Sequence, residues 1–441
     1  MSSGQSIFVS DAPISDPAHD RFNRLWFAKR VAQTISARLD PSSLVIAIYG
    51  AWGDGKTTVL NFIGTELKSI PEIIVLSLNP WRFATERSLL RYFFSSLAKT
   101  LELELSISAE EAATRVMQFG ELVQLFSSGT GDAPDLANEK LAAIDIEEQK
   151  RRIAEILAQN QKRVVILMDD IDRLDENAMQ AVFRLAKLTA DFENTVYVLA
   201  FDADMVASVL GERFTASVGK RPQAGRDFLE KIVQVPLDLP AVPAGALRKF
   251  TFESVTEALS IARMKITEAD AKQFIRLFYE GLEIRLKTPR MAKRFGNALA
   301  FTLAINKDEV NAVEMMLVEG IRILYPNAYA AIKKSREILA TTGIVSGVDL
   351  DRDERVQRFF SATMKGLTTA EASALRRLLA ALFPRIVGRA RYDPDEEADW
   401  ARAKRVTSAE YFDRYFSYAI PSKTQNEDMQ HLAAIITQHG V

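Results

Sequence analysis

The segment from Gly50 to Thr57 has the residue types and the spacing of a phosphate-binding loop, the Walker A pattern G-x-x-x-x-G-K-[ST]. Its glycines allow backbone turns that bulkier residues avoid, so that successive N–H groups can converge on a β-phosphate at the positive end of the next helix. Lys56 supplies a positive charge for the β- and γ-phosphates, and the Thr57 hydroxyl can ligate Mg²⁺. The pattern predicts that a nucleoside triphosphate contacts the following residues: Gly50, Trp52, Gly53, Asp54, Gly55, Lys56, Thr57 and Thr58.

The loop needs a buried strand before it and a helix after it, and the sequence supplies both. Residues 44–49 form a continuous apolar run rich in β-branched side chains, which is typical of a parallel strand buried on both faces. After the loop, apolar residues recur at helical spacing: Val59, Leu60, Phe62, Ile63 and Leu67. Because both flanking elements agree with the motif, a glycine turn beside an unrelated lysine is the weaker interpretation.

A second group of candidate residues, Asp169 and Asp170, ends an apolar run that begins at Val164. Parallel strands deliver their carboxyl ends to one edge of a sheet, so these acids should lie beside the loop, as in a Walker B strand. Asp169 is then the expected Mg²⁺ ligand, and Asp170 the residue that orients or deprotonates the attacking water. The alternative, in which the acids only cap a following helix, does not explain why they follow a complete phosphate-binding loop.

Further strand-like runs predict a parallel α/β sheet. They cover residues 72–79, 195–201 and 231–239, and segments of helical periodicity separate the predicted strands. Strands that alternate with helices form a parallel sheet with right-handed connections. A helix ahead of the first strand is expected to bury the following stripe: Phe22, Leu25, Trp26, Ala28, Val31, Ile35 and Leu39.

Beyond Pro240 the sequence predicts helices only. Patterns with a period of 3.6 cover residues 250–262, 269–280, 288–305, 310–324 and 369–383. We therefore predict an α/β P-loop NTPase core followed by an all-α C-terminal region. The expected domains are an N-terminal leader and helix (1–40), the P-loop NTPase core (41–240), a helical lid (241–305) and a C-terminal helical domain (306–441).

The composition of the 441-residue chain excludes several kinds of site. The chain has no cysteine, which rules out disulfides and thiolate chemistry, and its three histidines lie far in sequence from the loop, which argues against zinc sites and histidine-based triads. A net charge of −2 gives no overall attraction to nucleic acid or anionic membranes. The polar N-terminus lacks the pattern of a signal peptide, and no run reaches the ~20 apolar residues of a transmembrane helix, so we expect a cytoplasmic protein.

The order of the motifs resembles that of the KAP family of P-loop NTPases over roughly residues 20–300. The resemblance is carried by GAWGDGKTT at 50–58, LNPWRF at 78–83, LMDDIDRLD at 167–175, LAFDADMV at 199–206 and FLEKIVQVPLDLP at 228–240, and YFDRYFSYAIP at 411–421 resembles the tail of bacterial soluble members. It implies an ATPase of the additional-strand (ASCE) class, related to AAA+ and STAND proteins. Members of the family act as membrane-linked scaffolds or in phage exclusion and antiviral defence.

The chain departs from the family pattern at one point. Many KAP proteins carry transmembrane helices between the phosphate-binding loop and the acidic strand. Here that interval contains the polar stretch SSGTGDAPDLA at 127–137, which predicts a mobile loop, and charged helical patterns. We therefore predict no transmembrane segment in this interval.

Two arginines are candidates for a role from outside the predicted sheet. The helix expected at 288–299 has Pro289 in its first turn and carries Arg290 and Arg294 on one face. It resembles the lid helix whose arginine senses the γ-phosphate in related ATPases. We expect Arg290 or Arg294 to contribute in this way to catalysis, the alternative being a solvated helix face.

Other charged residues near the motifs allow two interpretations each. Asp202 either senses the γ-phosphate or, as the better supported interpretation, caps the next helix. Arg226 is either an arginine finger or, by default, a surface charge. Arg173 is expected to form an ion pair that orients Asp170 or Asp172. Trp81 is expected to be a packed corner rather than part of a binding cage.

The motifs together predict an ATPase with ATP and Mg²⁺ as its ligands. GTP is not favoured, because the closest match to Asn-Lys-x-Asp is residues 306–309, which lack the final aspartate. We expect nucleotide state to be coupled to conformation or assembly, in a homo-oligomer or protein complex serving antiviral defence or signalling. The alternatives are a slowly hydrolysing, STAND-like switch, or an ATPase that acts with nucleic acid through the following basic residues: Arg285, Lys287, Arg290, Lys293 and Arg294.

Overall fold

The computed structural model describes residues 12–105, 151–340, 350–386 and 394–417, apart from 84, 152–153, 190–191, 213 and 216. The chain divides into two compact units. We call residues 12–243 the sheet unit and the residues from 244 onward the helical unit. The loop predicted at 127–137 lies outside the described residues, as do the last residues of the 411–421 block.

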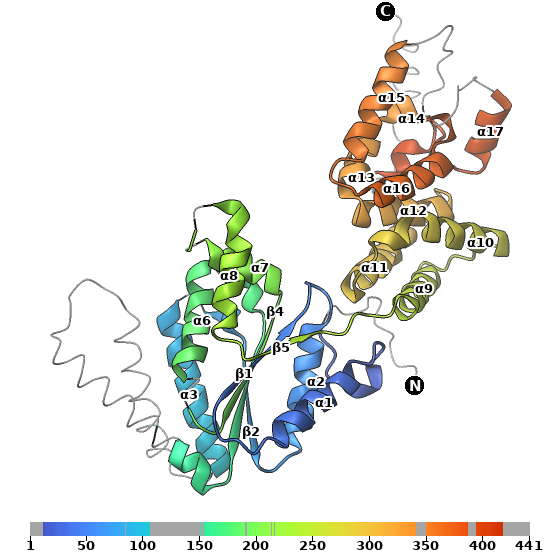
Figure 1. The fold of residues 1–441 in the computed structure, drawn as a ribbon. Coiled ribbons are helices and arrows are strands. Elements are labelled where there is room, and N and C mark those ends of the chain that lie inside the picture. The colour runs from blue at the N-terminus through green and yellow to red at the C-terminus, as the bar shows by residue number, and fades with distance from the viewer. Residues whose placement is uncertain are drawn as a thin grey trace, which may run out of the picture. The chain divides into compact units, whose positions relative to one another are not determined.

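The sheet unit contains a five-stranded parallel sheet in the order β2-β3-β4-β1-β5, shown in Figure 1. The strands are β1 (Leu44–Tyr49), β2 (Ile73–Leu78), β3 (Arg163–Met168), β4 (Thr195–Phe201) and β5 (Val235–Asp238). β4 lies between the strand that precedes the phosphate-binding loop and the strand that precedes the acidic pair. This extra strand confirms the predicted additional-strand P-loop fold.

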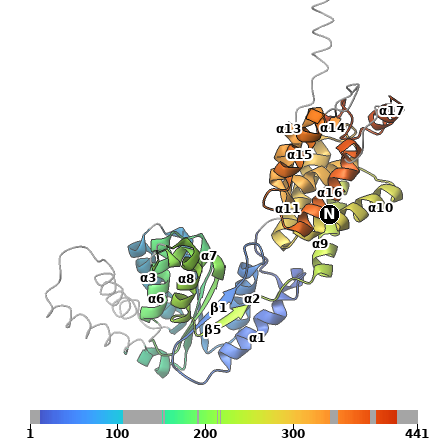
Figure 2. The same ribbon diagram turned by 45° about the horizontal axis from the view of Figure 1, so that its top comes forward.

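Helices cover both faces of the sheet, as Figures 1 and 2 show. On one face lie α1 (Arg24–Ser36) and α2 (Lys56–Lys68), and on the other lie α3 (Glu86–Leu105), α6 (Glu176–Thr189), α7 (Ala203–Gly211) and α8 (Arg221–Glu230). Each face has its own hydrophobic core, because successive side chains of a strand point to opposite faces. Apart from Arg163 and Thr195 at their first positions, the central strands β3, β4 and β1 therefore consist of hydrophobic residues, as the sequence predicted.

The stripe predicted for the first helix is only partly correct. Ala28, Val31 and Ile35 are buried against α2 and the sheet. Trp26, in contrast, is 64% exposed, and its ring lies 5.1 Å from the guanidinium of Arg30. Leu39 is 96% exposed because the helix ends at Ser36, before the stripe can continue.

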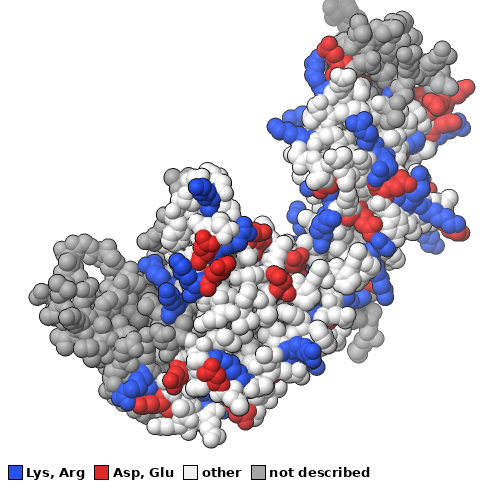
Figure 3. Space-filling model, in the orientation of Figure 1, with Lys and Arg blue, Asp and Glu red and all other residues white. Residues whose placement is uncertain are grey.

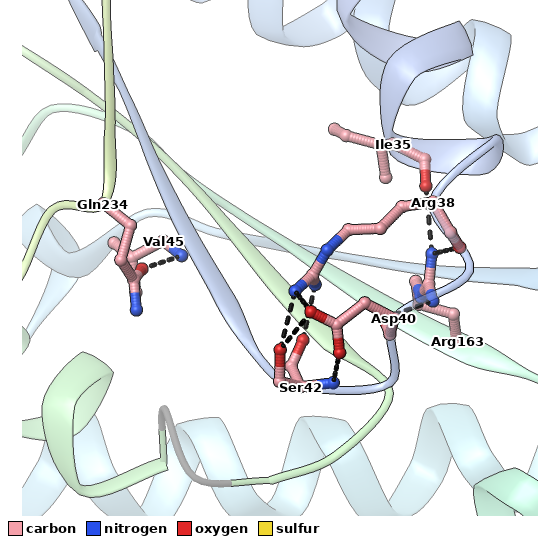
Figure 4. A network of polar contacts seen from close by, with 7 residues as sticks. All are labelled: Ile35, Arg38, Asp40, Ser42, Val45, Arg163 and Gln234. Atoms are coloured by element: carbon pink, nitrogen blue, oxygen red, sulfur yellow. Dashed lines mark hydrogen bonds and ion pairs between the residues drawn. The ribbon is translucent and has the colours of Figure 1, made fainter.

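Arg163, at the start of β3, fixes the end of α1 relative to the sheet (Figure 4). Its guanidinium donates to the carbonyl oxygens of Ile35 at 3.0 Å, Arg38 at 2.7 Å and Asp40 at 3.1 Å. These carbonyls belong to the last turn of α1 and the loop before β1, and at a helix end they have no partner within the helix. The single arginine thereby ties the segment that leads into β1 to β3.

Two glycines allow α7 and α8 to pack with their backbones in contact. A Cβ atom on Gly225 would lie 1.8 Å from the carbonyl oxygen of Ala207, and one on Gly211 would lie 1.9 Å from that of Arg221. Real Cβ atoms never approach this closely, so any side chain at either position must push the helices apart.

Gly225→Ala is accordingly expected to lower the free energy of unfolding of the sheet unit by about 3 kcal/mol, since the added methyl group cannot fit without moving the backbone. Urea unfolding followed by circular dichroism measures this loss. Gly219→Ala is the matched control, because a Cβ there meets nothing within 4 Å. Equal stability of the two variants would contradict the close contact of α7 and α8.

The helical unit contains the helices that the sequence predicted and several that it did not. The predicted helices correspond to α9 (Ala244–Ile261), α10 (Glu268–Leu277) with a π-helical turn at Phe278–Leu282, α11 (Pro289–Ile305), α12 (Ala312–Leu324) and α16 (Thr369–Leu382). Not predicted were α13 (Pro326–Lys334), α14 (Arg336–Ala340), α15 (Leu350–Thr363) and α17 (Pro394–Arg402). No helix in the described part of the chain is both long enough and apolar enough to cross a membrane.

A buried carboxylate holds the segment after α17 onto α12. Glu314 accepts hydrogen bonds from Arg405 Nε at 2.6 Å and from the Val406 N–H at 2.7 Å. Burial raises the pKa of Glu314, and the charge of Arg405 opposes that rise. Tyr415 forms a second contact with the start of α12, because its hydroxyl accepts a hydrogen bond from the N–H of the N-cap residue Asn311 at 2.9 Å. The 405–415 segment is therefore part of the core of the helical unit.

Candidate nucleotide-binding site

The phosphate-binding loop connects β1 to the first turn of α2 and needs glycine at two positions. Gly53 and Gly55 have φ angles of 96° and 94°, in the left-handed region that other residues rarely adopt. Gly55 is also the N-cap of α2, and a Cβ there would meet nothing within 4 Å. The loop thus presents the N-terminus of a 13-residue helix to open space, an arrangement suited to an anion.

Lys56 is buried at the start of α2 and already has partners. Its ammonium group donates to the carbonyl oxygen of Gly50 at 2.9 Å and lies 3.1 Å from the Asp172 carboxylate. Both members of this ion pair are less than a tenth exposed. A phosphate in the loop would have to replace these partners, so the lysine is held in place before a ligand arrives.

Asp172 is the main residue of this site that the sequence interpretation missed. Besides pairing with Lys56, it accepts a hydrogen bond from the Asp202 N–H at 3.1 Å. It belongs to the 3₁₀ turn at Ile171–Arg173, which follows the acidic pair and folds its carboxylate back under the loop. Asp202 itself caps α7, since it accepts a hydrogen bond from the Met205 N–H, so the capping interpretation of that residue is the one observed.

Asp172→Asn is expected to tighten ATP binding by about three- to tenfold, because the neutral side chain no longer competes with phosphate for Lys56. The amide oxygen can still accept the Asp202 N–H. Titration with a fluorescent ATP analogue measures the change. Asp204→Asn, an exposed neighbour, is the control, and weaker binding by Asp172→Asn would show that the carboxylate is needed to orient the lysine.

Asp169 has the properties of a cation ligand. One of its oxygens accepts the Asp170 N–H at 2.8 Å, and the other, Oδ2, is buried without a hydrogen-bond donor in the described part of the chain. Burial raises the pKa of Asp169, and the nearby Thr57 hydroxyl and Lys56 oppose that rise. A buried carboxylate oxygen without a donor, next to a hydroxyl, fits Mg²⁺, which prefers oxygen ligands.

Asp170 is fixed by two neighbours and an uncommon backbone conformation. Its φ angle is 57°, which is rare outside glycine and turns its side chain away from the line of β3. The carboxylate accepts hydrogen bonds from Asn79 Nδ2 at 3.0 Å and lies 2.8 Å from Arg173 Nε. The ion pair predicted for Arg173 is therefore confirmed, with Asp170 as its partner.

Asn79 and Trp81 reach this group from the end of β2, the strand next to β3. Trp81 is 56% exposed, and its ring lies 5.7 Å from the Arg173 guanidinium, so the expectation of a packed corner is wrong. The side chain stacks on the arginine that holds Asp170 instead. The sequence did not identify Asn79 as a residue of the site. Asn79 directly follows β2, and the acidic pair directly follows β3, the strand next to it.

A cavity of about 410 Å³ opens beside Thr57 and Asp169, between α2 and the end of β2. Polar side chains line much of it, among them Asn61, Asn79 and Arg82. Thr57 is the one residue of the predicted loop that lines it, so the cavity leaves room for water beside the expected cation position. The site thus combines a cation-binding oxygen, a fixed carboxylate and accessible space.

Three other residues that the sequence predicts to contact nucleotide are exposed or have partners within the protein. Trp52 is 67% exposed, and the Asp54 carboxylate accepts the Ala51 N–H at 3.0 Å, which closes the turn of the loop. The Thr58 hydroxyl accepts the N–H of Ile14 at 3.2 Å, so it binds the N-terminal segment of the sheet unit. A direct contact of these three with nucleotide stays a prediction.

The candidate arginines lie on α8 of the sheet unit and on α11 of the helical unit. Arg226 pairs with Asp204 at 2.7 Å on the surface of the sheet unit, in agreement with a surface charge. Arg290 and Arg294 both lie on α11 of the helical unit, so their role as sensors of the γ-phosphate stays a prediction.

Comparison with known proteins identifies relatives in sequence and in structure. The chain is 25% identical to the Phage T7 exclusion protein of Escherichia coli (strain K12) over 354 residues, which is 72% of this chain and 46% of that protein. It therefore spans about half the length of that curated relative. Among solved structures, it is similar to the ORC1 protein of Aeropyrum pernix in complex with DNA, with 15% identity, 82% of each chain covered and a TM-score of 0.33.

A second structural neighbour is CDC6P from Pyrobaculum aerophilum, with 9% identity, coverage of 86% of this chain and 98% of that chain, and a TM-score of 0.38. TM-scores this low support no conclusion about the chain beyond the strand order described above.

The KAP family P-loop domain matches residues 24–306, which is well over half of the chain and includes the loop, the acidic strand end and α11. The strand order, the glycine loop and this match agree: the chain belongs to the KAP family of P-loop NTPases.

Proposed function

We propose that this protein binds ATP with Mg²⁺ at the loop of residues 50–58 and hydrolyses it. The observation that carries the proposal is the grouping of Lys56, Asp169 and Asp170 at the carboxyl edge of one parallel sheet. Lys56 belongs to the loop, Asp169 offers a buried oxygen without a donor among the described residues, and Asn79 and Arg173 hold the Asp170 carboxylate in place. This is the set of groups that phosphoryl transfer to water needs.

Each residue has a separate task in this proposal. Lys56 moves from Asp172 and the Gly50 carbonyl to the β- and γ-phosphates when ATP enters. Asp170 accepts a proton from the attacking water or orients that water, and Asn79 and Arg173 hold its carboxylate for this purpose. Arg290 or Arg294 of the helical unit adds a positive charge near the γ-phosphate in the transition state.

The metal has a defined place in the proposal. Asp169 and Thr57 would hold Mg²⁺, which when bound neutralises charge on the phosphate oxygens. A proton on Asp169 would prevent this, and because burial raises the pKa of this residue, protonation competes at a higher pH than for an exposed aspartate. Metal binding should therefore weaken on acidification sooner than at an ordinary carboxylate site.

For the cellular role we propose antiviral defence or signalling in the cytoplasm, in a homo-oligomer or protein complex whose assembly depends on nucleotide. The support is the relationship to the Phage T7 exclusion protein, together with a helical unit that follows the ATPase fold. A slowly hydrolysing switch of the STAND type is the alternative within the same fold, because it would use the same binding site and differ only in turnover.

Size-exclusion chromatography of the full chain with and without Mg²⁺ and ATP, together with the rate of phosphate release, separates the two functions. A functional ATPase releases phosphate continuously, whereas a switch releases phosphate at most once per assembled chain. A change of elution volume on binding ATP supports nucleotide-dependent assembly in either case. If neither ATP binding nor a change of state occurs at millimolar ATP, the proposed function is wrong.

The described basic residues do not favour action on nucleic acid. On the face shown in Figure 3, lysine and arginine side chains are interspersed with aspartate and glutamate in both units. Arg285, one of the basic residues considered, lies 3.7 Å from Glu371 and 5.2 Å from the ring of Tyr325, so it already has partners inside the helical unit. A nucleic-acid interface normally requires a contiguous basic surface.

A further inference from the structure

The segment that leaves the sheet unit passes directly over the phosphate-binding loop. β5 ends at Asp238, and the N–H of Leu239 then donates to the carbonyl oxygen of Tyr49 at 2.7 Å. The Leu239 side chain covers Gly50, since a Cβ built there would lie 3.3 Å from Leu239 Cβ and Cδ2. Residues 239–243 are the last of the sheet unit, so the chain touches the loop just before the helical unit begins.

One buried side chain connects this segment to the loop a second time. Arg24, the first residue of α1, is only 3% exposed. Its Nη2 donates to the carbonyl oxygen of Asp54 at 2.9 Å, and its Nη1 donates to the carbonyl oxygen of Pro240. The guanidinium therefore joins three separate parts of the chain: the start of α1, the phosphate-binding loop and the exit segment.

In the described part of the chain, the buried guanidinium of Arg24 lacks the carboxylate partner that would compensate its charge in a purely stabilising contact. No carboxylate forms a direct ion pair with it among the described residues, and its Nε has no hydrogen-bond partner there. Burial lowers the pKa of Arg24, and the charges of Asp54 and Asp20 oppose that effect. A buried charge held only by backbone carbonyls is unfavourable by itself, which suggests a role in positioning those carbonyls.

We propose that Arg24 is a positioning residue that couples the phosphate-binding loop to the exit segment 239–243, an inference that rests on the proposed binding of ATP. When phosphate draws the loop N–H groups toward it, the Asp54 peptide shifts, and Arg24 passes the shift to Pro240 because its planar fork holds both carbonyls at once. A lysine carries the same charge but cannot form both bonds in this fixed geometry.

Hydrogen exchange of the full chain, with and without Mg²⁺ and a non-hydrolysable ATP analogue, tests the coupling. In the wild type we expect the nucleotide to slow exchange both in the loop, residues 50–56, and in residues 239–247. In Arg24→Met we expect the loop to remain protected by nucleotide, with affinity lowered about tenfold, while the response of residues 239–247 is lost. Arg24→Lys should lose most of that response as well.

The control is Arg30→Met, an exposed arginine of the same helix that contacts Trp26, which should respond like the wild type. The inference is overturned if residues 239–247 of the wild type do not respond while the loop does, or if both Arg24 variants respond like the wild type. The first of these outcomes needs no variant, so it decides the question even if Arg24→Met does not fold. Absence of protection in the wild-type loop itself would instead contradict the proposed ATP binding.

Discussion

Lys56→Ala is expected to weaken binding of ATP by about 10- to 150-fold, because it removes the charged donor of the phosphate-binding loop. Loss of a charge-assisted hydrogen bond to phosphate corresponds to about 1.5–3 kcal/mol, and the loop amides alone replace little of it. Titration of the purified chain with a fluorescent ATP analogue in Mg²⁺ measures the affinity.

The same substitution leaves Asp172 buried without its cation, so a fall in stability has to be separated from a loss of binding. The double variant Lys56→Ala/Asp172→Asn removes both charges and serves as the matched control. We expect it to unfold at a higher temperature than Lys56→Ala and to bind ATP as poorly. If the double variant recovered binding, the effect of Lys56→Ala would be structural, and the lysine would not be a phosphate ligand.

Asp170→Asn is expected to lower the turnover of ATP by about 100- to 10,000-fold while changing the affinity for ATP by less than about threefold. Asparagine has the same shape and can still accept hydrogen bonds from Asn79 and Arg173, but it cannot take a proton from water. Phosphate release and analogue titration on the same preparation separate the two quantities.

Asp175→Asn is the matched control for this variant. Asp175 is exposed, lies five positions further along the same loop and caps α6 through the Ala178 N–H, a bond that asparagine can also form. Turnover should be unchanged in this control. If Asp170→Asn hydrolysed ATP at the wild-type rate, Asp170 would not be the catalytic base, and Asp172 would be the next residue to test.

Much of the sheet unit was predictable because its strands are buried on both faces. β1 and β4 have the predicted boundaries, and β2 is shorter than predicted only by the polar residues Glu72 and Asn79. β5 begins four residues later than predicted and ends one residue earlier, although Ile232, Val233 and Leu239 are apolar. The cap of α7 at Asp202 also followed from residue type. These features depend on local chemistry and on the sheet edge to which parallel strands deliver their ends.

The unpredicted features of the site depend on which side chains meet across separate elements. Asp172 pairs with Lys56 because a 3₁₀ turn follows β3, and nothing in the spacing of the acids shows which of them turns toward the loop. Asn79 contacts Asp170 only because β2 is the neighbour of β3 in the sheet. Arg24 looks like any surface arginine at a helix start until the exit segment is placed over it.

Steady-state release of phosphate from Mg²⁺ and ATP by the full chain tests the central proposal most directly. The chain should release phosphate in a metal-dependent reaction. At ATP concentrations below saturation, Lys56→Ala should reduce the rate by about 10- to 150-fold through weaker binding, and Asp170→Asn should reduce it by at least about 100-fold through slower turnover. A metal-dependent rate that is the same in the wild type and in both variants would contradict the proposal.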